Sequence, residues 1–211
     1  LSAADAEKLC SAVAEAEEVI PVICFESGLS CPDAPTCISA DNDQMGRELG
    51  ELILDSGITE GKVCLIGSKV NCQSIQARLT GASAVLEDNG FTICTQELPL
   101  QAGNFSEYDA IAALDTHYLE DTAIALSNTG EKIPLFGIGA NDKIAYYMEQ
   151  NVICGIVVQN EVEMGYLGAK QAADTVRNGK QNTVSDVEFR VITKETMYQK
   201  ENEQLLFPFD S

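Results

Sequence analysis

The stretch Ile133–Asn160, IPLFGIGANDKIAYYMEQNVICGIVVQN, decides the fold of this chain. It predicts a strand over Ile133–Ile138, a short helix, and a second strand over Val152–Val158. The pair Asn141-Asp142 opens the helix, whose apolar residues recur at helical spacing. Both strands are apolar at consecutive positions, which is typical of strands covered on both faces of a parallel sheet. The stretch therefore predicts a parallel βαβ unit.

Polar residues follow both strands of this unit, at the ends where ligands bind in parallel α/β sheets. The first strand is followed by Gly139 and Asn141, and the second by Gln159 and Asn160. Polar groups also follow the other predicted strands, at Glu26, Ser27, Ser68, Glu97, Asp115 and Thr116. Any one of them alone is typical of a helix cap or a turn. Their repetition at successive strand ends favours a site for a small solute rich in hydroxyl groups.

The rest of the chain repeats the alternation of strands and helices. Helices are predicted from the N-terminus to Glu18 and over 42–56, 74–87, 119–128 and 162–178. Strands are predicted over 20–25, 36–40, 62–66, 91–98, 110–114 and 187–193. This rhythm predicts an α/β fold with parallel strands. Only eleven residues separate Leu98 from Ala110, whereas a parallel crossover needs about a dozen. Either this connection is unusual or its helix is absent.

The negative charge of the chain disfavours two classes of partner. The chain carries 33 acidic and 13 basic residues, a net charge of −20, which disfavours binding to nucleic acid or to an anionic membrane. Hydrophobic residues make up 45% of the sequence, enough for a globular core. No apolar run reaches the roughly 20 residues of a membrane span. The sequence begins inside a helical pattern, so we expect the N-terminus to be incomplete.

The eight cysteines form no CxxC or Cys/His metal pattern. Four of them lie inside apolar strands and are expected to act as small buried hydrophobes, namely Cys24, Cys64, Cys94 and Cys154. Cys31 and Cys37 flank the loop CPDAPTC, where a disulfide is the less favoured of two alternatives because sequence does not show the required geometry.

Enzyme patterns are weak. The segment Gly137–Asp142 mimics a dinucleotide fingerprint, but the carboxylate of Asp142 occupies its sixth position and would face a pyrophosphate. The only histidine, His117, lies beside Asp115 and is read as a residue at the start of a helix. No catalytic triad, metal cluster or phosphate loop is present. The sequence therefore predicts no enzyme, no cofactor and no bound metal.

A set of segments in fixed order resembles a known family. The segments are IPVICFESG (20–28), ISADNDQMGRELGELI (38–53), GKVCLIGS (61–68), QARLTGA (76–82), AIAALDTHY (110–118), IPLFGIGAND (133–142), GIVVQNEVEMGYLGAKQAADTVRNGK (155–180) and VITKETMY (191–198). Together they resemble the type I periplasmic binding proteins, and within them the ribose/galactose-type sugar-binding components of ABC transporters. Single segments are weak signals, whereas the ordered set is specific.

The resemblance implies a two-lobed periplasmic-binding-protein-like I fold with parallel sheets, in which three crossover strands join the lobes. It also implies that the first lobe is incomplete at its N-terminal side. The first lobe would hold residues 1–40 plus 160–187, and the second lobe residues 41–158 plus 188–211. Solute would bind in the cleft between the lobes, which close on it by a hinge motion.

Family ligand contacts carry over to some positions and not to others. Ser27 replaces a family arginine, Gly139 replaces a family aspartate, and Arg78 matches a second family arginine. The family positions together with Asn141, which comes from the strand-end pattern, give the expected ligand-binding residues. These are Glu26, Ser27, Gln76, Asp115, Asn141 and Gln159. Gln159 is expected to be both the firmest contact and a hinge.

The function implied is capture of a sugar or related polyol for ABC import. The expected partners are a membrane permease or a chemoreceptor, without nucleic acid, and the chain is expected to be a monomer. Its expected location is the periplasm or, as a lipid-anchored protein, the bacterial cell surface. The alternative is the ligand-sensing effector domain of a LacI-type transcriptional repressor or of a receptor. A DNA-binding segment upstream would favour the repressor, and a signal peptide would favour transport.

Overall fold

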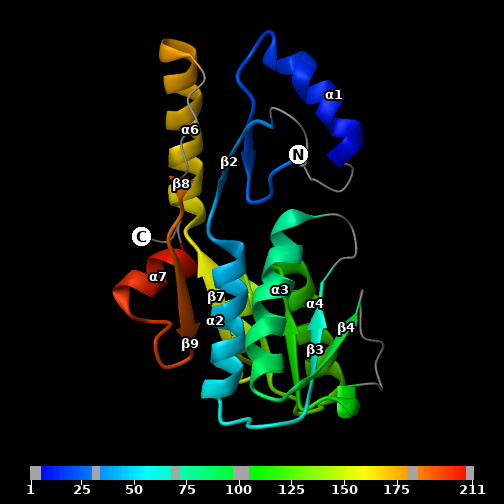
Figure 1. The fold of residues 1–211 in the computed structure, drawn as a ribbon. Helices are drawn as coiled ribbons and strands as arrows, with labels where there is room; N and C mark the ends of the chain where they lie inside the picture. The colour runs from blue at the N-terminus through cyan, green and yellow to red at the C-terminus, as the bar shows by residue number, and fades with distance from the viewer. Residues whose placement is uncertain (1–5, 30–33, 68–71, 97–104, 180–184, 208–211) are drawn as a thin grey trace.

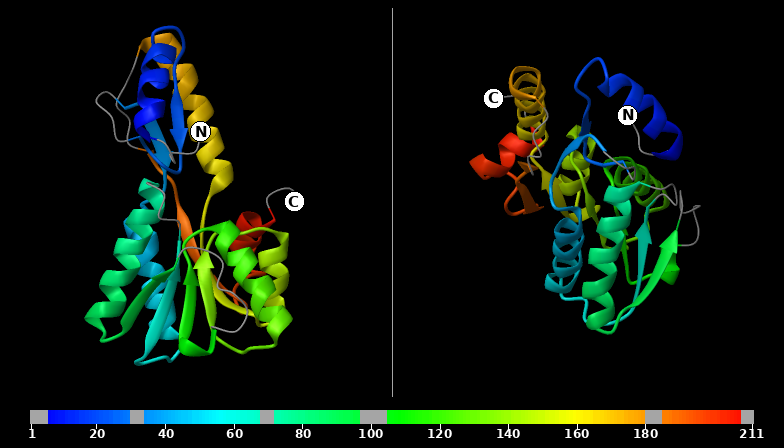
Figure 2. Two further views of the ribbon diagram at one scale, coloured as in Figure 1. Left: turned by 90° about the vertical axis from the view of Figure 1, so that its right-hand side faces the viewer. Right: turned by 45° about the horizontal axis from the view of Figure 1, so that its top comes forward.

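The computed structural model describes residues 6–29, 34–67, 72–96, 105–179 and 185–207. They form two sheets that lie end to end, and the parallel strands of the larger sheet point toward the smaller one, whereas its antiparallel edge strand points away (Figures 1 and 2). We call the small sheet with its helices the first lobe, and the large sheet with its helices the second lobe. None of the described helices is both long and apolar enough to span a membrane.

The first lobe has three parallel strands in the order β1-β2-β8, which are Ile23–Phe25, Thr36–Ser39 and Ser185–Asp186. The strands lie between two helices, α1 (Ala6–Glu17) and α6 (Glu161–Asn178) (Figure 1). Val13 of α1 packs on Cys24 and Leu29 in a small apolar cluster. The main cores therefore lie in the second lobe.

The second lobe has six strands in the order β4-β3-β5-β6-β7-β9. In chain order they are β3 Lys62–Ile66, β4 Thr92–Gln96, β5 Ala110–Ala113, β6 Leu135–Ile138, β7 Ile153–Gln159 and β9 Phe189–Thr193. Each face of this sheet carries an apolar core, which is why most of its strand positions are buried.

Two helices cover each face of the large sheet. One face carries α2 (Asn42–Asp55) and α3 (Gln73–Asp88), and the other carries α4 (Thr116–Thr129) and α5 (Asp142–Glu149). A short helix, α7 (Lys200–Leu206), follows β9 at the edge of the lobe (Figure 1). Helix starts follow the capping rule, since the side chains of Asp41, Asp115, Asn141 and Asn160 each accept a main-chain N–H of the following helix.

The predicted α/β class and strand order along the chain are confirmed, with corrections. The first strand begins at Ile23 rather than Ile20, because Pro21 lacks a main-chain donor and Ile20 is exposed. The last strand, β9, is antiparallel to β7, whereas parallel strands were expected throughout. Only residues 187 and 188 separate β8 from β9, so the chain passes directly from the first lobe into the second. Strand β9 therefore runs in the direction opposite to β7.

The short connection after β4 lies partly outside the described residues, which resume at a single 3-10 turn, Phe105–Glu107. Strand β3 pairs with both β4 and β5, so the connection crosses β3. Phe105 is fully buried and Tyr108 nearly so, and both belong to the core on the α4 face. The described part of this connection thus places aromatic side chains in the core where an ordinary crossover would place a helix.

The cysteine expectations hold only in part. Cys24 and Cys64 are buried, as expected, and burial raises the pKa of the Cys64 thiol to about 12. Cys94 is half-buried and Cys154 is exposed, which corrects the expectation for both. Cys154 faces an open hollow beside the amino-terminal end of β7. Cys37 is a free thiol, so the alternative of a Cys31–Cys37 disulfide was wrong, and Cys31 itself lies outside the described residues.

One further cysteine differs from the rest in its bonding. Cys10, on α1, is disulfide-bonded, a state that the sequence analysis did not anticipate. Disulfides persist mainly in oxidising compartments outside the cytoplasm. The bonded state of Cys10 is therefore consistent with a protein that works outside the cytoplasm.

Candidate functional site

The two lobes meet where the turn after β1 contacts the start of α3. The Oγ of Ser27 accepts the main-chain N–H of Ser74 at 3.4 Å and lies 3.6 Å from the Sγ of Cys72. Just before it, Glu26 has a φ of 63°, a left-handed backbone conformation that is uncommon for a residue other than glycine. The turn after β1 therefore combines a left-handed backbone conformation at Glu26 with a hydrogen bond between Ser27 and α3 at the junction of the lobes.

Arg78 is the centre of this junction. Its side chain is almost completely buried, on the face of α3 that packs toward α2 and the sheet. Its Nε donates to Asn42 Oδ1 at 2.8 Å, and its Nη1 donates to the carbonyl oxygen of Leu114 at 3.0 Å. Its Nη2 donates to Glu26 Oε1 at 2.8 Å. A charged side chain that is this deeply buried requires such partners.

Asp115 follows directly after Leu114 and caps α4, where its Oδ1 accepts the N–H of Tyr118 at 2.9 Å. Burial raises the pKa of the Asp115 carboxyl, although the Tyr118 hydrogen bond and the positive charge of Arg78 act in the opposite direction. The negative charge of Glu26 adds to the rise. Because the carbonyl oxygen of Leu114 accepts from Arg78, the adjacent Asp115 lies in the same cluster as Arg78 and Glu26.

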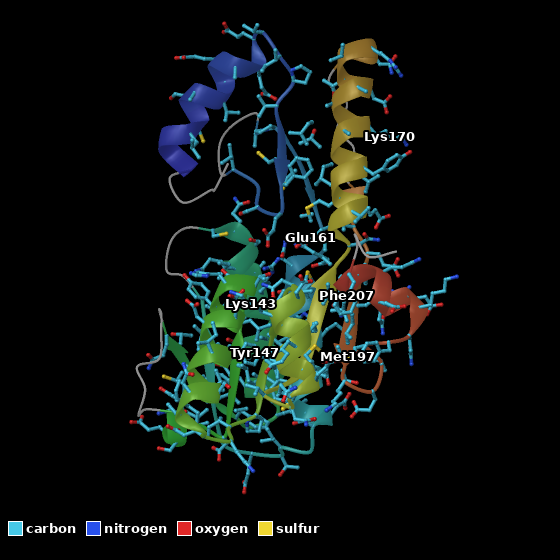
Figure 3. The ribbon with its side chains drawn as sticks, turned by 180° about the vertical axis from the view of Figure 1, so that it is seen from behind. Lys143, Tyr147, Glu161, Lys170, Met197 and Phe207 are labelled. Carbon is cyan, nitrogen blue, oxygen red and sulfur yellow. The ribbon has the colours of Figure 1, made fainter. Side chains whose placement is uncertain are left out.

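Gln159 and Glu161 contribute from the strand and helix that connect the lobes. Gln159 ends β7 and is 9% exposed, and its Oε1 has no hydrogen-bond partner among the described residues. Glu161 begins α6, and Figure 3 shows it at the junction of the lobes. Partial desolvation raises the pKa of the Glu161 carboxyl, and the charge of Glu26 raises it further. The junction therefore holds several acidic or acceptor groups.

Two of the predicted site residues, Asn141 and Gln76, make no contact with this cluster among the described residues. Asn141 caps α5 by accepting the N–H of Ile144 at 2.8 Å, and its Nδ2 donates to Glu120 at 2.9 Å. Both functional groups of Asn141 are therefore used inside the second lobe. Gln76 is exposed on the surface of α3. The structure thus brings Glu26, Ser27 and Asp115 together around Arg78, and no contact joins Asn141 or Gln76 to them among the described residues.

Gly139 lies where the resemblance led us to expect an aspartate, and its geometry does not admit a side chain. Its φ is +114°, and a β-carbon at this position would overlap the Oγ1 of Thr116. A side chain there would therefore be strained by both the backbone conformation and the lack of space. The aspartate that the family resemblance led us to expect at this point is not compatible with the local structure of this chain.

The sequence analysis did not assign roles to Asn42 or Glu161, and it treated Arg78 only as a match to the family. A signal for Arg78 was present, because Ile75, Arg78 and Ala82 share one face of α3 and the two apolar residues are buried. A cation on an otherwise buried helix face indicates a buried partner. The identity of that partner was not readable, because Glu26 lies 52 residues away in the chain.

A separate hollow of about 620 Å³ lies at the opposite ends of the strands, between the last turns of α4 and α5. It is lined by residues that include Tyr146, Tyr147, Gln150 and Cys154. Figure 3 shows Tyr147 in the body of the second lobe, below the junction marked by Glu161. No group of three His, Cys, Asp or Glu among the described residues is placed to hold a metal ion.

Comparison with protein families gives a match over most of the chain. Residues 1–181 match the family model described as periplasmic binding protein domain. No match was found among curated protein sequences.

Comparison with solved structures gives the same fold. A carbohydrate transporter solute-binding protein from Agrobacterium radiobacter, in complex with D-arabinose, is 22% identical with a TM-score of 0.81, covering 92% of this chain and 73% of its own. An ABC transporter solute-binding protein from Agrobacterium vitis with bound D-fucose is 18% identical with a TM-score of 0.80, covering 90% and 72%. The XylFII–LytSN complex matches at 19% identity and a TM-score of 0.72, covering 86% and 70%.

Proposed function

Because the chain belongs to the periplasmic binding protein domain family, we propose that it captures a sugar or related polyol between its two lobes for import by an ABC transporter. The match to a periplasmic binding protein domain supports a solute-binding role outside the cytoplasm. Two structures of the same fold hold D-arabinose and D-fucose, which are small neutral sugars. These relatives support a monosaccharide-sized ligand.

One observation carries the proposal, namely the buried acceptor of Gln159. A buried amide oxygen without a partner costs about 1–3 kcal/mol, so a group that donates to Gln159 Oε1 would relieve that cost. Gln159 ends β7, at the carboxyl edge where ligands of parallel sheets bind. A sugar hydroxyl is a donor of the right size and polarity.

The charges around the junction narrow the ligand class. Acceptor groups at the junction include the carboxylates of Glu26, Asp115 and Glu161 and the unpaired Oε1 of Gln159. Arg78, the buried cation among the residues that the structure describes, already donates to three protein oxygens. A ligand with many donors and no negative charge fits this pattern, whereas sugar acids and sugar phosphates would meet carboxylates. We therefore propose neutral sugars, polyols or amino sugars.

The partner follows from the same assignment. We propose a permease of an ABC transporter as the primary partner, with the chain working in the periplasm or held at the cell surface by a lipid. The structurally similar XylFII occurs in a complex with LytSN, which makes a protein other than a permease the second candidate. A chemoreceptor would belong to this second class.

The proposal is tested by isothermal titration of the chain with a panel of pentoses, hexoses, polyols and their acidic derivatives. We expect a neutral or amino sugar to bind and the matching uronic acid not to bind. Gln159→Ala should weaken the best ligand about tenfold, as expected for loss of one hydrogen bond of about 1.4 kcal/mol. The matched control is Gln150→Ala, at the exposed end of α5, which should leave affinity unchanged. If no sugar or polyol in the panel binds, the proposed function is wrong.

A further inference from the structure

Glu26 and Arg78 form an ion pair between the two lobes. Glu26 follows β1 of the first lobe, and Arg78 lies on α3 of the second lobe. The Nη2–Oε1 distance is 2.8 Å, and the Arg78 side chain is 2% exposed against 45% for Glu26. Among the ion pairs of the described residues, this is the one that joins the two lobes. Its position makes it a direct link between the lobes.

Arg78 is fixed by its own lobe before it meets Glu26. Asn42 holds its Nε from the first turn of α2, and the carbonyl oxygen of Leu114 holds its Nη1 from the end of β5. Both acceptors are neutral, so they orient the guanidinium without cancelling its charge. The planar guanidinium then has little freedom left, and Nη2 is presented toward the first lobe. Glu26 is the carboxylate that forms an ion pair with Arg78 directly, and it comes from the first lobe.

The contacts around Glu26 come from the same two lobes. The main-chain oxygen of Glu26 accepts from Asn42 Nδ2 at 3.3 Å, so Asn42 bonds to both members of the pair. Ser27 accepts the N–H of Ser74 from the start of α3. Glu26 also keeps the left-handed φ of 63°, which is maintained only where surrounding contacts fix it. The turn and α3 therefore dock as a unit.

We propose that Glu26 and Arg78 are a latch that holds the two lobes together and sets how often they part. When the lobes separate, Arg78 keeps its contacts to Asn42 and Leu114 and loses only the carboxylate of Glu26. Every group in the latch belongs to the protein, so the latch acts whether or not a ligand is bound. Closure around a solute then starts from a population already shifted toward contact between the lobes. Arg78 is in this sense a positioning residue.

The test compares two variants that each remove one carboxylate. Glu26→Gln removes the charge across the lobes, and Glu26→Ala removes the contact altogether. The control is Glu120→Gln, which breaks the ion pair of Glu120 with Lys143 inside the second lobe, between α4 and α5. Because Glu26 is half-exposed, its replacement should leave the chain folded, which circular dichroism verifies.

Two readouts report the separation of the lobes. Small-angle X-ray scattering should give a larger radius of gyration for both Glu26 variants than for the wild type, and an unchanged value for Glu120→Gln. Hydrogen exchange of the Ser74 amide, which is bonded to Ser27 of the first lobe, should accelerate at least severalfold in Glu26→Ala and stay unchanged in the control. A folded Glu26→Ala protein with wild-type scattering and wild-type exchange at Ser74 would overturn the latch.

Discussion

Gly46 of α2 lies against the main-chain carbonyl of Arg78 on α3, so closely that a β-carbon at Gly46 would overlap that carbonyl oxygen. The reciprocal contact occurs one turn away, where a β-carbon at Gly81 would overlap the carbonyl of Asp43. The two helices therefore touch through their backbones. This close approach places Asn42, at the start of α2, within 2.8 Å of the Arg78 side chain.

Gly46→Ala should therefore destabilise the second lobe. The added methyl group forces α2 and α3 apart at a fully packed contact, which costs about 1–3 kcal/mol, partly offset by a gain in helix propensity of about 1 kcal/mol. Urea unfolding measures the difference. The control is Gly165→Ala on α6, where a β-carbon meets open space, and this variant should be as stable as the wild type or more so. Equal stability of Gly46→Ala and the wild type would contradict the close contact.

Asp115 should make stability depend on pH in an unusual direction. Its pKa is raised above the ordinary value of 3.8, mainly by burial. A carboxyl whose pKa is raised on folding stabilises the fold most when it is protonated, and that contribution is lost as the pH rises through the folded pKa.

Asp115→Asn keeps an oxygen that can cap α4 and removes the charge. It should be more stable than the wild type at pH 7, and the advantage should shrink as the pH falls toward 3.8. Urea unfolding at a series of pH values measures this. Asp41→Asn changes an exposed cap on α2 and should show no comparable gain at pH 7. A loss of stability in Asp115→Asn at pH 7 would show that Arg78 needs the Asp115 charge.

Asn141 should stabilise the fold mainly by capping the start of α5. Asn141→Ala removes the acceptor for the Ile144 N–H and should cost about 1 kcal/mol. Asn141→Ser keeps a capping oxygen and should recover most of this loss. Thermal unfolding of both variants measures the effect, and equal losses in the two would show that the bond to Glu120 matters more than the cap.

Cys154 should react with thiol reagents before Cys64. Cys154 is exposed at the edge of an open hollow, whereas Cys64 is fully buried and its pKa is raised to about 12. Labelling the native protein with iodoacetamide, followed by peptide mass spectrometry, should find modified Cys154 and unmodified Cys64. Urea should make both thiols react. Labelling of Cys64 at the rate of Cys154 in the native protein would contradict the packing of β3.

Elements whose signals are local were predictable from the sequence. The strand Lys62–Ile66 was predicted with its observed bounds, because a short apolar run between turn residues leaves little choice. The helix starts after Asp41 and Asn141 were predicted from capping side chains that act within three residues. The helices capped by Asp115 and Asn160 begin at Thr116 and Glu161, ahead of the predicted starts at 119 and 162. The short helix α7 was missed because its sequence, KENEQLL, has no apolar period.

For the candidate site too, some features were predictable from local sequence and others were not. The sequence by itself placed polar residues at the ends of parallel strands, since that pattern depends only on where each strand stops. Tertiary structure alone decided which of them meet: Glu26 reaches Arg78 across 52 residues, and Asn141 turns to Glu120 instead. Tertiary structure likewise decided the direction of β9 and the exposure of Cys154. Contacts between distant segments depend on how the two lobes pack, and no local preference of the chain encodes that packing.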